Sequence, residues 1–138
     1  MKRIPKKNSS ETRAQGRGTI LIVEDERLML RLLEKFFSQH GYHVLVASDG
    51  EQAIEVYRCY KLRIGAVLLD VRLPKISGGE VLRRLKEENA AVKVVIASGY
   101  LEADIKTQMA FAGVTHFVSK PYILDELLET VRSVIEEP

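Results

Sequence analysis

The stretch AVLLDVRLP, residues 66–74, places a single carboxylate at the end of an apolar run, with a proline four residues later. Val67, Leu68 and Leu69 are typical of a strand that is buried on both faces, as strands of parallel sheets are. A carboxylate inside such a strand would be costly to desolvate. We therefore expect Asp70 to lie at the exit of the strand, where neighbouring groups can offset its charge.

Similar short apolar segments recur along the chain and alternate with segments whose apolar residues are spaced three or four apart. The predicted strands are residues 19–23, 43–47, 65–70, 92–98 and 114–120. A helix is predicted after each strand, including one at about residues 102–112 and one that begins near residue 124. Ser48 with Glu51, and Ser77 with Glu80, match the capping-box pattern and predict where the second and third helices begin.

Five strand–helix units of ordinary connection length predict an α/β fold, with a doubly wound parallel sheet covered by helices on both faces. In such sheets, ligands bind outside the carboxyl ends of the strands. Any functional site is therefore expected at that edge of the sheet.

Composition and length favour one soluble domain. The chain has 138 residues, of which 46% are hydrophobic and 29% charged, which is ordinary for a globular protein. No apolar run approaches the ~20 residues that cross a bilayer, and no secretion signal is recognisable. The single cysteine, Cys59, excludes an internal disulfide and fits a reducing compartment, so we expect a cytoplasmic protein. Its place near the end of the second helix predicts a buried or half-buried apolar filler.

The first 18 residues differ from the rest of the chain. They carry six basic residues against Glu11 alone, a net charge of +5, while the whole chain carries +2. This segment lacks aromatic residues and is interrupted by proline and glycine, so we expect residues 1–18 to be a disordered basic extension or linker. Residues 19–138 then form the single domain. Contact with nucleic acid or an anionic membrane is the alternative role for the basic segment.

Polar side chains follow four of the five predicted strands. Glu24 and Asp25 come after the first strand, Asp70 ends the third, Ser98 ends the fourth and Lys120 ends the fifth. Clustered carboxylates repel one another unless a cation lies among them, and oxygen-only ligands suit Mg²⁺. An aspartate can accept a phosphoryl group as an aspartyl-phosphate. A lysine and Mg²⁺ would then stabilise the charge on the transferring group, and the hydroxyl of Ser98 could donate a hydrogen bond to it.

In order and spacing, the segments ILIVEDE, LLDVRLPKISGGEVL, VVIASGY and FVSKPY resemble the response-regulator receiver domain of two-component phosphorelay signalling. The resemblance covers residues 19–138. It implies a flavodoxin-like (βα)5 fold with strand order 2-1-3-4-5, an order for which a receiver-domain protein is one of the standard examples. It also implies that Asp70 is the phosphoacceptor. The magnesium ligands would be Asp70, Glu24, Asp25 and the backbone carbonyl of Arg72, with glutamate at position 24 where many relatives have aspartate.

The resemblance assigns further roles near the ends of the last two strands. Lys120 would contact the phosphoryl group, and Ser98 and Phe117 would be the two switch residues that respond to phosphorylation. The Lys120–Pro121 peptide bond would be cis, which costs little only before proline.

The function implied is a signalling switch, not an enzyme, that takes part in its own phosphorylation and slow self-dephosphorylation. The donor would be a histidine kinase or a histidine phosphotransfer domain. A downstream protein would bind the face formed by the fourth helix, fifth strand and fifth helix. The chain ends at Pro138, directly after the last helix, so no DNA-binding output domain is expected. A stand-alone regulator and the receiver end of a hybrid histidine kinase both fit. Met109 and Phe111 fit either the core or a homodimer interface.

A phosphohydrolase of the haloacid-dehalogenase type is the main alternative, because such enzymes also form an aspartyl-phosphate. That chemistry needs a second acid two residues beyond the nucleophile to act as general acid and base. Arg72 occupies that position here, which argues strongly against a phosphohydrolase.

Overall fold

The computed structural model describes residues 17–99, 113–114 and 116–138. In chain order, the described elements are β1 (Thr19–Val23), α2 (Arg27–Gln39), β2 (His43–Ala47), α3 (Gly50–Tyr60), β3 (Ile64–Asp70), α4 (Gly78–Glu88), β4 (Val94–Ser98), β5 (His116–Ser119) and α6 (Leu124–Glu136). The helix predicted at about residues 102–112 and nearly all of the basic N-terminal segment lie outside the described residues.

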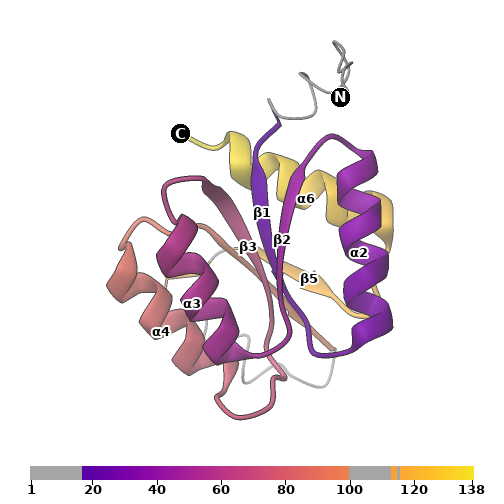
Figure 1. Ribbon diagram of the computed structural model, residues 1–138. Coiled ribbons are helices and arrows are strands. Elements are labelled where there is room, and N and C mark those ends of the chain that lie inside the picture. The colour runs from indigo at the N-terminus through magenta and orange to yellow at the C-terminus, as the bar shows by residue number, and fades with distance from the viewer. Residues whose placement is uncertain (1–16, 100–112, 115) are drawn as a thin grey trace, which may run out of the picture.

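The five strands form one sheet in the order β2-β1-β3-β4-β5, and each neighbouring pair is parallel. Helices α3 and α4 cover one face, while α2 and α6 cover the other (Figure 1). The predicted doubly wound fold and its strand order are therefore confirmed. All five strands run in one direction, so their carboxyl ends meet at a single edge of the sheet.

Side-chain alternation along each strand divides the core into two layers. In β1, Leu21 and Val23 face α3 and α4, whereas Ile20 and Ile22 face α2 and α6. The central strand β3 is buried along nearly all of its length, because helices cover both of its faces. Its near-continuous apolar sequence thus follows from its position in the sheet.

The loop between β3 and α4 is packed tightly against the start of α3. A Cβ added at Gly78 would lie 2.9 Å from the Cα of Val71, so α4 begins directly against the exit of β3. Across the loop, the Lys75 ammonium lies 3.3 Å from Asp49 Oδ2, at the start of α3. These contacts fix the segment that follows Asp70.

The capping pattern in the sequence predicted the start of α4 correctly but not the N-cap of α3. Ser77 caps α4 as expected, with its side chain accepting a hydrogen bond from the Glu80 N–H at 3.1 Å. The capping box predicted for Ser48 and Glu51 is wrong, because Asp49 is the N-cap of α3 and accepts from the Gln52 N–H at 2.8 Å. Strands β4 and β5 are also shorter than predicted, since their paired residues begin at 94 and 116.

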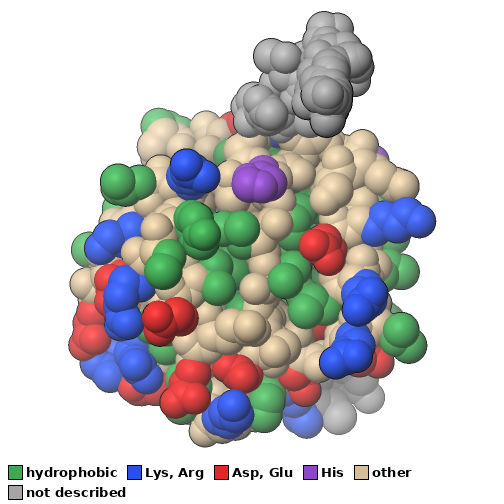
Figure 2. All heavy atoms as spheres, in the orientation of Figure 1, with side chains coloured by type: hydrophobic (Ala, Val, Ile, Leu, Met, Phe, Trp, Pro, Cys, Tyr) green, Lys and Arg blue, Asp and Glu red, His purple; other side chains and the backbone are tan. Residues whose placement is uncertain are grey.

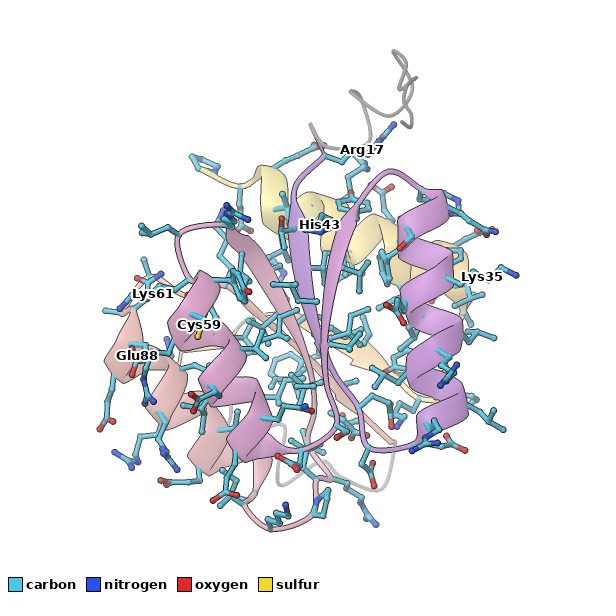
Figure 3. The ribbon with its side chains drawn as sticks, viewed as in Figure 1. Arg17, Lys35, His43, Cys59, Lys61 and Glu88 are labelled. Atoms are coloured by element: carbon cyan, nitrogen blue, oxygen red, sulfur yellow. The ribbon has the colours of Figure 1, made fainter. Side chains whose placement is uncertain are left out.

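Cys59 is exposed rather than buried as an apolar filler, so that prediction is also wrong. Figure 3 shows the side chain in the last turn of α3. The buried positions of this helix are Gly50, Ala53, Ile54 and Tyr57. Residue 59 lies outside that stripe, because residues that share a face of a helix are three or four apart.

The edge of the sheet at which the strands begin, here called the amino edge, carries both ends of the described chain. Arg17 lies close to His43, at the start of β2 (Figure 3). The other end reaches the same edge, since the Lys93 ammonium, just before β4, contacts the backbone carbonyl of Glu137.

On the edge strand β2, the side chains of Val44, Leu45 and Val46 are only half-buried, and hydrophobic side chains are visible between the flanking helices (Figure 2). None of the described helices has the length and hydrophobicity needed to cross a bilayer.

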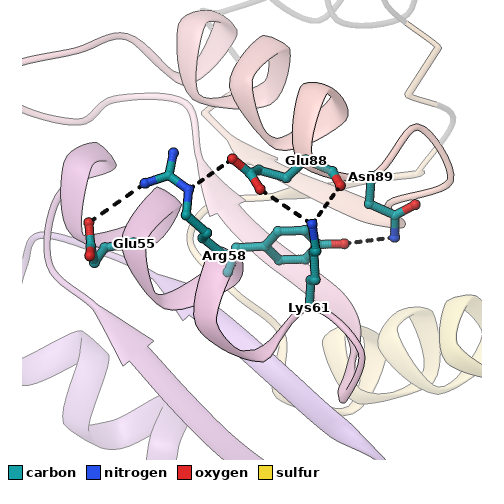
Figure 4. Close-up of polar contacts among 6 residues, drawn as sticks. Glu55, Arg58, Lys61, Glu88 and Asn89 are labelled. Carbon is teal, nitrogen blue, oxygen red and sulfur yellow. Dashed lines mark hydrogen bonds and ion pairs between the residues drawn. The ribbon is translucent and has the colours of Figure 1, made fainter.

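Polar contacts join α3 and α4 where these two helices end (Figure 4). Glu88 accepts from Arg58 Nε at 2.9 Å, and its backbone carbonyl accepts from Lys61 Nζ at 3.2 Å. Arg58 is half exposed, so its ion pair contributes little to stability. The buried contact beside it matters more: the hydroxyl of Tyr57, a residue only 1% exposed, accepts a hydrogen bond from the Asn89 side-chain amide at 3.0 Å.

We expect Tyr57→Phe to lower the free energy of unfolding by about 1 kcal/mol, because the Asn89 amide loses a partner in a partly buried site. Urea unfolding followed by circular dichroism measures this change. Tyr60→Phe is the matched control, since Tyr60 is 43% exposed and its hydroxyl makes no hydrogen bond within the described part of the chain. Equal stabilities for the two variants would show that the Tyr57–Asn89 bond does not contribute.

Candidate functional site

The carboxyl edge of the sheet brings the predicted polar residues together. Glu24 follows β1, Asp70 ends β3 and Ser98 ends β4. These strands are direct neighbours, with Val23 opposite Leu69 and Asp70 opposite Ala97. Lys120 follows β5, and its N–H donates to the Ser98 carbonyl at 2.9 Å. The polar residues therefore converge because the sheet is parallel and its strands end at similar heights.

Three carboxylates form a compact acidic cluster at this edge. One oxygen from each of Glu24, Asp25 and Asp70 lies within 4.8 Å of the others. Glu24 and Asp70 are buried, at 2% and 4% exposure, whereas Asp25 is exposed. An oxygen-only donor set of this kind fits a hard divalent cation with few protein ligands, such as Mg²⁺. The exposed side chain of Asp25 leaves one side of the cluster open to solvent.

Glu24 has both carboxylate oxygens engaged within the protein. Its Oε2 accepts from the Glu26 N–H at 3.2 Å, and its Oε1 lies 3.3 Å from Lys120 Nζ. Burial raises the pKa of Glu24, and repulsion from Asp70 adds to the rise, while the Glu26 N–H and Lys120 oppose it. Burial and repulsion from Asp70 thus disfavour the ionised form of Glu24, and a bound cation would stabilise that form.

Lys120 bridges the two buried carboxylates. Its ammonium lies 2.9 Å from Asp70 Oδ2 as well as 3.3 Å from Glu24 Oε1. Desolvation by burial opposes the charged form, but the contacts with Asp70 and Glu24 outweigh it, and the pKa of Lys120 is raised. The lysine therefore stays protonated at neutral pH. The Lys120–Pro121 peptide bond is cis.

Asp70 lies where the strand ends, with both of its oxygens in contact with donors. Its Oδ1 accepts from the Arg72 N–H at 3.0 Å, while Oδ2 faces Lys120. The first of these bonds folds the backbone of residues 70–72 around the carboxylate. A carboxylate can therefore end this buried strand, because one ammonium and one backbone N–H offset its charge.

The two predicted switch residues lie on neighbouring strands. Ser98 is 7% exposed at the end of β4. Phe117 lies in β5 opposite Ile96, half-buried against the core layer that contains α3 and α4. Ser98 thus borders the acidic cluster, whereas Phe117 lies further back along the sheet. Tyr100, which follows Ser98 by two residues, lies outside the described residues.

One residue of this site was missing from the sequence-based set. The Tyr122 ring lies beneath the Lys120 ammonium, with 5.7 Å between Nζ and the ring centroid. Desolvation by burial raises the pKa of its phenol well above the ordinary range, with smaller contributions from Glu24 and Asp70. An aromatic residue two positions after a lysine is too common a pattern to have singled it out.

Comparisons with known proteins agree with the geometry. Residues 20–132 match the family model of the response regulator receiver domain. The chain is 34% identical over 117 residues to sporulation initiation phosphotransferase F of Bacillus subtilis, covering 84% of this chain and 92% of that protein. It is 32% identical over 121 residues to the uncharacterized transcriptional regulatory protein YkoG of the same organism, covering 88% of this chain but only 52% of that longer protein.

A solved structure extends the comparison to three dimensions. The crystal structure of the CheX–CheY–BeF3–Mg+2 complex from Borrelia burgdorferi contains a chain that matches with a TM-score of 0.80 and 26% identity. The match covers 87% of this chain and 90% of that one.

Proposed function

The chain belongs to the response regulator receiver family, and on that premise we propose that it is a signalling switch whose Asp70 accepts a phosphoryl group. The observation that supports this proposal most directly is the position of Lys120. Its ammonium lies 2.9 Å from Asp70 Oδ2, beside an acidic cluster that fits a divalent cation. The proposed nucleophile, a positive charge and the proposed metal ligands thus share one edge of the sheet.

The proposed reaction transfers a phosphoryl group from a phosphohistidine of a histidine kinase or histidine phosphotransfer domain. A carboxylate oxygen of Asp70 forms a bond to phosphorus as the bond from phosphorus to the donor nitrogen breaks. The electron pair of that bond stays on the imidazole, and Asp70 becomes an acyl phosphate. Lys120 holds its positive charge next to the oxygens on which negative charge gathers during transfer.

Magnesium is the proposed cofactor. Asp25, Asp70 and the backbone carbonyl of Arg72 would hold it, with Glu24 acting mainly through water. When bound, Mg²⁺ would neutralise charge on the phosphoryl oxygens and help to fix their geometry. Phosphorylation would then act on Ser98 and Phe117 as switch residues and shift the population of active forms.

The proposed output surface is the face formed by the helix expected at about residues 102–112, β5 and α6. Only the last two of these elements lie in the described residues. Residues 1–18 are proposed to be an extension or linker outside the receiver domain of residues 19–138. A stand-alone regulator and a receiver within a hybrid histidine kinase both remain compatible with this proposal, as does a homodimer. A cytoplasmic location remains a prediction.

The direct test is phosphorylation in the absence of any kinase. Incubation with Mg²⁺ and acetyl phosphate should add one phosphoryl group per chain, as measured by intact-mass spectrometry. Chelation of Mg²⁺ with EDTA should suppress the gain. A chain that stays unmodified with Mg²⁺ present would contradict the proposed function.

The lifetime of the phosphorylated form is the next expectation. Hydrolysis of an aspartyl-phosphate requires a water in line with the leaving oxygen, and nearby side chains orient or exclude that water. Arg72 and Tyr100 hold the positions two residues after Asp70 and two after Ser98. Neither is a carboxylate or an amide that would hold an attacking water, so we expect slow self-dephosphorylation.

Replacing both side chains should therefore accelerate decay. The Arg72→Asn, Tyr100→Glu double variant should lose its phosphoryl group about tenfold faster or more, which corresponds to a barrier lower by ~1.4 kcal/mol. The measurement is the decay of phosphorylated protein after the donor has been removed. An unchanged or slower decay would show that these two side chains do not control access of water.

A further inference from the structure

Among the residues that the structure describes, the Lys120 ammonium contacts two carboxylates and one aromatic ring. Asp70 Oδ2 lies at 2.9 Å and Glu24 Oε1 at 3.3 Å. The third neighbour is the face of the Tyr122 ring, whose centroid is 5.7 Å from Nζ. That distance is within the range in which an aromatic ring attracts a cation.

The two carboxylates compete for the ammonium and lie on different strands. Glu24 follows β1 and Asp70 ends β3, so a shift of the lysine toward one acid draws it away from the other. The lysine side chain is a flexible four-carbon stem and is 28% exposed here. Two acidic partners alone therefore do not fix the position of the ammonium.

The Tyr122 ring is held in place by packing against the core, whereas the lysine stem is flexible. It packs against the core layer that contains α2 and α6, whose buried members include Leu127 and Val131. The phenol stays neutral at physiological pH, because burial and the nearby acids disfavour its ionised form. The ring thus presents an uncharged π face at a position set by the core.

We propose that Tyr122 is a positioning residue for phosphoryl transfer, whose ring face holds the Lys120 ammonium against Asp70. This inference rests on the proposed function, because the lysine must be in place as the oxygen–phosphorus bond to Asp70 forms and the bond to the leaving group breaks. The ring does not touch the reacting atoms. It limits how far the ammonium can move toward Glu24 or toward solvent.

The test is the initial rate at which acetyl phosphate labels the chain, followed by intact mass at saturating Mg²⁺. Tyr122→Leu keeps an apolar side chain but removes the π face, and should slow labelling about fivefold, the change expected for a cation–π contact of intermediate exposure. Tyr122→Phe keeps the face and should stay within about twofold of the wild-type rate. Tyr60→Leu is the matched control, because this tyrosine is exposed at the end of α3, and it should label at the wild-type rate.

A double-mutant cycle separates positioning from a general loss of structure. In a Lys120→Gln background there is no ammonium to hold, so Tyr122→Leu should cause no further loss. An equal loss in both backgrounds, or an undiminished rate in Tyr122→Leu alone, would overturn the inference while leaving Asp70 as the acceptor. A wild-type chain that takes no label would overturn the proposed function together with it.

Discussion

Asp70→Asn should abolish phosphorylation by acetyl phosphate. An amide oxygen is a far weaker nucleophile than a carboxylate, and Asp70 is the acid that ends β3, with Lys120 Nζ at 2.9 Å and the Arg72 N–H at 3.0 Å. The variant should still fold, since asparagine has nearly the same volume and keeps an acceptor for the Arg72 N–H. Intact mass after incubation with Mg²⁺ and acetyl phosphate measures the loss, and thermal unfolding checks the fold.

The matched control for this experiment is Asp125→Asn. Asp125 is an exposed aspartate in the first turn of α6, outside the acidic cluster, so its replacement should leave labelling unchanged. Labelling that persists in Asp70→Asn would mean that another residue is the acceptor. Loss of labelling in both variants would point to a general effect of charge.

The second large effect concerns the metal, and it should differ between two adjacent acids. Asp25→Ala should weaken Mg²⁺ binding by about 100-fold and Glu24→Ala by about tenfold, as expected for an outer-sphere partner. The structural reason is that both oxygens of Glu24 already accept hydrogen bonds, from Glu26 and Lys120. Asp25 is exposed and is therefore free to turn toward an ion. Titration calorimetry measures both affinities.

The raised pKa of Glu24 also predicts how stability without metal depends on pH. Burial raises the pKa of Glu24, so the folded state binds this proton more tightly than the unfolded state does. The ionised carboxylate therefore costs stability above the folded-state pKa, and the cost disappears as the pH falls below the ordinary value. Glu24→Ala should relieve part of that cost at neutral pH, although it removes packing.

Glu34→Ala provides the control for net charge, since Glu34 is exposed on α2 away from the cluster. It should leave Mg²⁺ affinity nearly unchanged. If Glu24→Ala weakens Mg²⁺ binding more than Asp25→Ala does, the two acids have been assigned to the wrong roles.

Most of the fold was predictable because its signals are long and mutually consistent. Five apolar strands, each followed by a helical pattern, leave few arrangements other than a parallel sheet covered on both faces. The convergence of Glu24, Asp70 and Lys120 then follows from topology, since residues just past parallel strands share one edge. Neither conclusion depends on the conformation of any single side chain.

The features that the sequence did not predict depend on which of several neighbouring residues makes a given contact. Ser48 and Asp49 both precede α3 and both can cap a helix, but the structure has Asp49 as the N-cap, while the Ser48 hydroxyl donates to Gln52 Oε1 at 3.1 Å. The exposure of Cys59 was predictable in principle, because it falls outside the stripe set by Ile54 and Tyr57.

The arrangement around Lys120 was beyond the reach of sequence patterns. A lysine stem has many rotamers. The position of its ammonium relative to the two acids and the ring is therefore set only by the surrounding fold. The same holds for Tyr122, whose role depends on core packing of a residue that no motif distinguishes. The residue types of the site were thus predictable, while the distances between them were not.

The placement of both ends of the described chain at the amino edge has a practical consequence for measurement. Arg17 and Pro138 lie at the opposite end of the strands from Asp70. A biosensor surface or a fluorophore attached at Pro138 would therefore hold the domain with its acidic cluster facing the bulk solution. Kinetic measurements on immobilised protein should then reproduce those made with free protein, because the attachment does not obstruct the approach of a phosphodonor.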